Sequence, residues 1–264
     1  MKKISIILLL LVCISLKTMA TESTTGFLPK DSVAAVVTKA VGDSAYMQKD
    51  YASAIQVYET LLQQGEAAEL YYNLGNSYYK TENLGKAILN YERALLLQPG
   101  NSDIRANLEI ARAKTVDNVV AIPELFFVTW FKALINCLSA DAWAKLGVVL
   151  FCLFLLAIVL YLFSNKLMYR KLGFSFGIFL FIAVILINIF ALKQKQSLVE
   201  RNQAVILSPS VVVRSTPSDN GVSLFVLHEG HKVEIKDNSM SSWKEIRLSD
   251  GKVGWVPVSS IEVI

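Results

Sequence analysis

Residues 70 to 99 read LYYNLGNSYYKTENLGKAILNYERALLLQP, and their pattern is the main indication of the structure of the N-terminal half. The small residues Gly75 and Ala87 allow two antiparallel helices to approach closely, while Tyr and Leu side chains fill the space between them. Pro99 ends the second helix, because proline cannot continue one. The stretch therefore predicts a tightly packed helical pair.

The same pattern occurs once before and is partly continued afterwards. Ala54, Ile55, Tyr58, Glu59 and Leu62 align with Ala87, Ile88, Tyr91, Glu92 and Leu95, 33 positions later. The second copy resembles the tetratricopeptide repeat family. Eight of its residues have the spacing of that repeat: Tyr71, Leu74, Gly75, Tyr78, Ala87, Tyr91, Ala94 and Pro99. We expect repeats over residues 33–115, with a final helix from Asp103 to Thr115 that caps the stack.

The resemblance also implies a partner-binding groove, lined by the first helix of each pair. The matching positions are Lys39, Asp43, Tyr46, Tyr72, Asn76, Tyr79 and Ala106. Tyrosines in such repeats are more often core residues than contacts, which favours a packing role for Tyr46 and Tyr79. We expect Tyr72 and Asn76 to contact the partner.

The N-terminus has the pattern of a secretory signal. Lys2 and Lys3 precede an apolar run from Ile4 to Leu16, and small residues precede a cleavage point after Ala20. Residues 1–20 are therefore predicted to be a signal peptide, which sends the following residues out of the cytoplasm.

Only 18% of the residues are charged, below the quarter that is usual in soluble proteins, and the deficit indicates a membrane protein. Two apolar runs predict membrane helices over residues 144–163 and 172–192. The loop between them, 164–171, contains Lys166, Arg170 and Lys171 and no acid, which favours the cytoplasmic side. The segments before and after the hairpin then share the outer side.

A short aromatic helix is predicted over residues 123–138, before the first span. Phe127, Trp130, Phe131 and Leu134 recur at helical spacing and form one apolar face. Two interpretations remain equal: the helix lies in the membrane interface, or its face packs against another subunit.

From residue 204 to 264 the apolar period changes to two, as in Val211 and Val213, with turn signals such as Asp250-Gly251. Five or six short strands in so few residues predict a small barrel. The segment resembles a bacterial SH3-like domain, a family that binds peptides or wall glycans or braces a neighbouring module. Trp243 and Trp255 are the candidate contact residues of its surface, although packing in the core or rim is equally compatible with them.

No catalytic constellation is present in the sequence, and we predict neither an enzyme nor a cofactor. The segment from His228 to His231 is one residue short of a zinc-binding HExxH motif, and Gly230 favours a turn there, so we predict no metal site. Removal of the signal would leave a nearly neutral chain, which gives no case for nucleic-acid binding.

The order of these modules resembles the BatE family of the Bacteroides aerotolerance operon along nearly the full length. Leu70 to Asn76, Lys86 to Ala94 and Leu227 to Gly230 carry the resemblance. It implies a bacterial inner-membrane protein with both soluble modules in the periplasm, acting in stress tolerance beside von Willebrand factor A-domain membrane proteins and, indirectly, a MoxR-type ATPase. The expected function is a non-enzymatic scaffold; the alternative is a sensor or anchor that binds peptidoglycan through the SH3-like domain.

Overall fold

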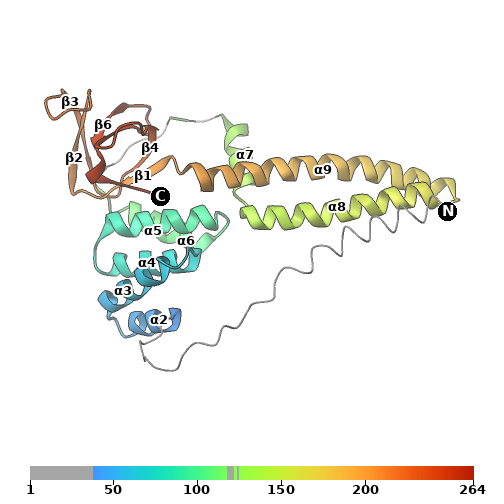
Figure 1. The fold of residues 1–264 in the computed structure, drawn as a ribbon, viewed down its shortest axis with the longest axis horizontal. Coiled ribbons are helices and arrows are strands. Elements are labelled where there is room, and N and C mark those ends of the chain that lie inside the picture. The colour runs from blue at the N-terminus through green and yellow to red at the C-terminus, as the bar shows by residue number, and fades with distance from the viewer. Residues whose placement is uncertain (1–37, 118–121, 124) are drawn as a thin grey trace. The chain divides into compact units, whose positions relative to one another are not determined.

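The computed structural model describes residues 38–117, 122–123 and 125–264 (Figure 1). The predicted signal peptide and the first residues of the predicted repeat region, 33–37, lie outside this part of the chain.

Helices α2 to α6 make up the repeat module. Their bounds are α2 Lys39–Met47, α3 Tyr51–Leu62, α4 Ala68–Lys80, α5 Leu84–Leu97 and α6 Ser102–Arg112. Side chains just before three of these helices accept hydrogen bonds from free backbone N–H groups and so fix where the helices begin: Asp50 for α3, Asn83 for α5 and Asn101 for α6. The predicted pair of helices between Leu70 and Pro99 is therefore present as α4 and α5.

A contact between glycine and tyrosine occurs in both copies of the repeat. A Cβ atom on Gly75 would lie 2.7 Å from the ring of Tyr91, and one on Gly42 would lie 2.6 Å from the ring of Tyr58. Both tyrosines are almost fully buried. Because only glycine permits this approach, the less regular first copy keeps the packing of the second.

Helices α7 Phe126–Ile135, α8 Ala140–Phe163 and α9 Leu167–Glu200 follow the repeat module. Ser139 caps α8, as its Oγ accepts a hydrogen bond from the N–H of Ala142. Helices α8 and α9 run antiparallel, side by side (Figure 1). By length and composition both are sufficient to cross a membrane. The predicted spans lie inside them, but α9 continues eight residues past Leu192 without a break.

The C-terminal residues form an antiparallel sheet, the β module. Its strands are β1 Gln203–Ile206, β2 Ser210–Arg214, β3 Ser223–His228, β4 Lys232–Asp237, β5 Trp243–Arg247, β6 Val253–Pro257 and, after the short helix η1 Val258–Ser260, β7 Ile261–Val263. The described residues make an open sheet in the order β3-β2-β6-β5-β4-β1-β7. It has more strands than predicted because the short β1 and β7 pair with each other. The predicted alternation holds in β2, where Val211 and Val213 are buried and Val212 is exposed.

The β module and the repeat module share part of one hydrophobic core. Val205 of β1 and Ile264 belong to the same buried cluster as Leu89 and Leu108. The turn between β3 and β4 also lies against the repeats, because a Cβ atom on Gly230 would be 2.7 Å from Ile88 of α5. Gly230 has a φ of +83°, so both its backbone and its surroundings require glycine. The β module is thus docked on α5, a contact that sequence analysis did not predict.

Candidate functional site

The predicted groove lies on α2, α4 and α6, the first helix of each pair, here called the A-helix face. At its N-terminal end, Lys39 forms ion pairs with Asp43 and with Glu69 of α4, both at 2.8 Å. Asp43 also accepts hydrogen bonds from Tyr58 and Asn73. Burial favours a higher pKa for Asp43, but the hydrogen bonds from Lys39 and Tyr58 outweigh it and lower the pKa. Asp43 therefore joins three helices and has few acceptor positions left for a partner.

Tyr72 and Asn76, the expected contact residues, take part in a network across α4, α5 and α6. The amide of Asn107 donates to the hydroxyl of Tyr72 at 3.0 Å and to Oδ1 of Asn76 at 2.9 Å. The hydroxyl of Tyr91 donates to the same Oδ1 at 2.8 Å. These contacts show that both residues position the neighbouring helices, and both side chains are only partly buried.

The remaining tyrosines of this face are half-buried. Tyr46 packs edge-to-face on Tyr51, with ring centroids 5.3 Å apart, and the ammonium of Lys114 lies 4.4 Å from the ring centroid of Tyr79. Burial and the nearby phenols of Tyr72, Tyr46 and Tyr79 together raise the pKa of Tyr91. Tyr46, Tyr72 and Tyr79 thus pack against the buried cluster that contains Tyr91.

Two exposed positions of the A-helix face are on α6. Ala106 is exposed, as is Ile110, which has 52% of its surface accessible. Sequence reasoning missed Ile110, although it follows Asn76 by the same interval as Asn107 follows Asn73. Extending the repeat alignment into α6 reveals it.

Residues 68–101 match the family model of the tetratricopeptide repeat. The match covers α4 and α5 and confirms the predicted repeat over that part of the chain. Tetratricopeptide repeats generally mediate the binding of protein partners, and the family is generally made of non-enzymatic scaffolds. The comparison with curated proteins found no match.

Trp243 and Trp255 lie on neighbouring strands of the β module. Trp255 is directly opposite Glu245, two residues along β5 from Trp243. Directly opposed residues and residues two apart share a sheet face, so both indoles are on one face. The buried Ile246 and Val256 are on the other face, and both tryptophans are partly exposed. The two side chains therefore lie outside the core of the sheet.

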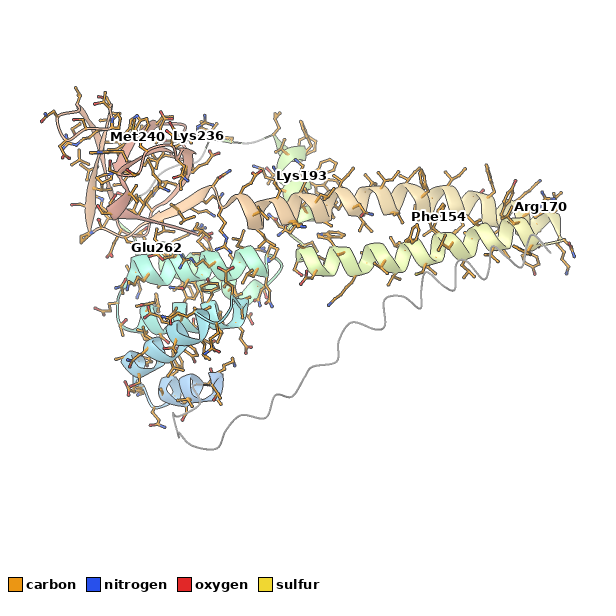
Figure 2. The ribbon with its side chains drawn as sticks, in the orientation of Figure 1. Phe154, Arg170, Lys193, Lys236, Met240 and Glu262 are labelled. Carbon is orange, nitrogen blue, oxygen red and sulfur yellow. The ribbon has the colours of Figure 1, made fainter. Side chains whose placement is uncertain are left out.

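Charged groups join the two modules. Glu92 of α5, almost fully buried, accepts hydrogen bonds from Arg112 and Lys232. Arg93 donates to Glu262 at 2.9 Å and to the carbonyl of Val263, and Figure 2 shows Glu262 beside α5.

Two further pairs extend this junction. Arg201, at the end of α9, pairs through both terminal nitrogens with Glu66 in the loop before α4. Asp117 lies 2.7 Å from Nδ1 of His228 and accepts a hydrogen bond from the N–H of the same residue. Repeat module, helix α9 and β module are therefore linked by direct contacts.

Within the described residues, no group of three or more His, Cys, Asp or Glu side chains could hold a metal ion. His228 is paired with Asp117, while burial lowers the pKa of His231. Both histidines thus belong to the contact between the modules.

Proposed function

We propose that this chain is a membrane-anchored scaffold that binds a protein segment on the A-helix face. The observation that carries the proposal is that the β module contacts α5 and the segment after α6, while Ala106 and Ile110 remain exposed. Polar and aromatic groups around them offer both hydrogen bonds and apolar area, the combination found in protein interfaces.

The anchor in this proposal is the hairpin of α8 and α9. Two helices of this length can span a hydrocarbon core of about 30 Å. The contacts between Arg93 and Glu262, and between Glu66 and Arg201, support a common side for both soluble modules, because direct ion pairs cannot cross a bilayer. Lys166 lies in the turn between α8 and α9, and Arg170 and Lys171 lie near the start of α9. This positive charge at one end of the hairpin favours the cytoplasm there, so the soluble modules are on the periplasmic side of a bacterial inner membrane.

The resemblance to the BatE family supports a more specific role. In this role the partner is a von Willebrand factor A-domain membrane protein, and a MoxR-type ATPase acts indirectly in the same complex for stress tolerance. No cofactor or catalytic residue takes part.

Photo-crosslinking from the A-helix face tests the scaffold. A photoreactive amino acid at Ala106 or Ile110 should capture a membrane protein in cells, because both side chains are exposed there. Gln56, exposed on the second helix of the first repeat, is the matched control. The same capture from Gln56, or none from either α6 position, contradicts binding on this face.

A wall-binding sensor or anchor is the alternative, favoured by the shared outer face of Trp243 and Trp255. Aromatic rings stack on sugar faces, so this face suits a glycan. Retention of the full chain on purified peptidoglycan, lost in a Trp243→Ala/Trp255→Ala variant, supports the alternative. If retention is absent while Ala106 still captures a protein, the scaffold is favoured.

A further inference from the structure

A polar cavity of about 400 Å³ lies where the repeat module, α9 and the β module meet. We call it the junction cavity, and Gln194, Ser197, Asn136, Gln203 and Arg105 are among its lining residues. These residues come from α9, the turn after α7, β1 and α6, so the cavity exists only when all these elements are assembled.

Gln194 is the most unusual residue of the junction cavity. It is only 4% exposed, yet its side-chain amide has no hydrogen-bond partner among the described residues. The buried, unpartnered side-chain atoms of the described residues are Arg93 Nε and His231 Nε2. The amide of Gln194 is not among them, so it faces the open space of the junction cavity, where it is free to bind a ligand. A leucine or isoleucine would fit at this position of α9, which is rich in both residues. The amide that is present instead indicates a polar ligand.

The charges around the junction cavity leave one positive charge without a counter-charge. Arg112 and Lys232 both pair with Glu92, and Arg112 also pairs with Glu109. Arg105 donates to the carbonyl of Pro99 at 2.6 Å and has no carboxylate partner within the described part of the chain. Its remaining N–H groups, with the amide N–H groups of Asn136, Gln194 and Gln203, are donors that suit an anion.

The position of the junction cavity along α9 suggests where the anion comes from. Gln194 follows the apolar run by two residues, which is about 3 Å along the helix axis. Asn136 precedes the cap of α8 by three residues. The turn before α6 contacts the same region, the turn after α7. A side chain on Gly100 would collide with the carbonyl of Cys137. If the hairpin spans the bilayer, these residues lie at the depth of the lipid headgroups.

We propose that the junction cavity binds a phosphate group with a single negative charge, the phosphodiester of an anionic lipid headgroup. Arg105 neutralises the phosphate, and the amides of Gln194, Asn136 and Gln203 donate to its oxygens or to headgroup hydroxyls. The lipid thereby ties α9 to the repeat and β modules. This proposal rests on the membrane anchor of the proposed function, and free phosphate is the other source of the same chemistry.

The test uses the purified full-length chain in a neutral detergent, titrated separately with phosphatidylglycerol, phosphatidylcholine and inorganic phosphate. We expect phosphatidylglycerol to raise Tm by several degrees and phosphatidylcholine to have little effect. A shift of equal size with inorganic phosphate would overturn the lipid as the source. Equal shifts with both lipids would overturn the proposed preference for an anionic headgroup, because phosphatidylcholine has the same phosphodiester but no net charge.

Two variants locate the effect. Gln194→Leu should leave Tm without lipid within a few degrees of the parent, because the side chain keeps its size, and should abolish the shift with phosphatidylglycerol. Arg105→Gln should weaken binding about tenfold or more, as expected for loss of a charged hydrogen bond. The controls are Gln196→Leu, exposed on the same helix, and Arg247→Gln, exposed and without an acidic partner among the described residues. A full shift in Gln194→Leu, or equal losses in the controls, overturns the site.

Flotation with liposomes distinguishes failure of the lipid site from failure of the proposed membrane anchor. A chain that floats and resists carbonate extraction, yet shows no shift with phosphatidylglycerol, retains its anchor but has no lipid site. A chain that does not float overturns both, because the junction cavity would not lie at the headgroups.

Discussion

Nζ of Lys232 in β4 lies 2.7 Å from Oε2 of Glu92 in α5. The two residues are 140 positions apart in the chain and belong to different modules. The other carboxylate oxygen of Glu92 accepts from Arg112. A single buried carboxylate therefore pairs with one cation from each module.

The first prediction concerns this carboxylate. Glu92→Gln should destabilise the protein by about 1–3 kcal/mol, because both cations lose a charged hydrogen-bond acceptor. Thermal unfolding gives the size of the loss, and limited proteolysis should show that the β module separates more readily. Glu109→Gln is the control, since its pair with Arg112 is exposed and surface pairs contribute little. Equal losses from both changes would show that Glu92 has no special role.

The packing of the repeat leads to a second prediction. Gly75→Ala should destabilise the repeat module by about 1–3 kcal/mol, although alanine favours helix, because the added methyl overlaps the ring of Tyr91. Gly65→Ala should have little effect, as nothing lies within 4 Å of a Cβ atom there. Denaturant unfolding followed by circular dichroism compares the two. A Gly75→Ala protein as stable as the parent would mean that the two helices can move apart at no cost.

The pH dependence of stability should reflect His231. Burial lowers the pKa of its imidazole below the usual 6.5, although Asp117 and Asp250 partly oppose this. Unfolding therefore takes up a proton below about pH 6.5, and stability should fall as the pH decreases from 7.5 to 5.5.

Thermal unfolding at both pH values, for the parent and for His231→Gln, measures this effect. The difference between the two proteins removes the contribution of the other titrating groups. The variant should lose less stability at pH 5.5 than the parent does. Identical pH dependence in both proteins would show that burial of His231 has no energetic consequence.

The hairpin of α8 and α9 leads to a fourth prediction. A Cβ atom on Gly173 would lie 2.9 Å from the backbone nitrogen of Tyr161 and 3.0 Å from the carbonyl oxygen of Ala157, and backbone atoms cannot easily move away. Gly173→Ala should therefore push the helices apart and lower Tm in detergent. Gly177→Ala, where the nearest atom is 3.9 Å away, is the matched control. A larger effect at Gly177 would contradict this packing.

The repeat was predictable because its signals are local. The contacts of Gly75 with Tyr91 and of Gly42 with Tyr58 each join residues 16 positions apart, and they recur at a fixed interval. The alternation of Val211 and Val213 likewise predicts one buried face, because strand geometry places alternate residues on the same side.

The roles of Tyr72 and Asn76 were less predictable, because Asn107 and Tyr91 come from other helices to bond with them. The burial of Gln194 depends on packing between α9 and elements distant in sequence. Docking of the β module on α5 has one local sign, the glycine at position 230, and its meaning is visible only beside Ile88.

Helix α9 continues from its apolar segment to Glu200, and only Arg201 and Asn202 separate it from β1. Arg201 is bonded to Glu66. In a bilayer, a change in the tilt of this helix would reach the strand and the loop before α4 without an intervening flexible linker. If the hairpin spans a bilayer, as proposed, membrane thickness and lateral tension would therefore alter the orientation of the repeat surface.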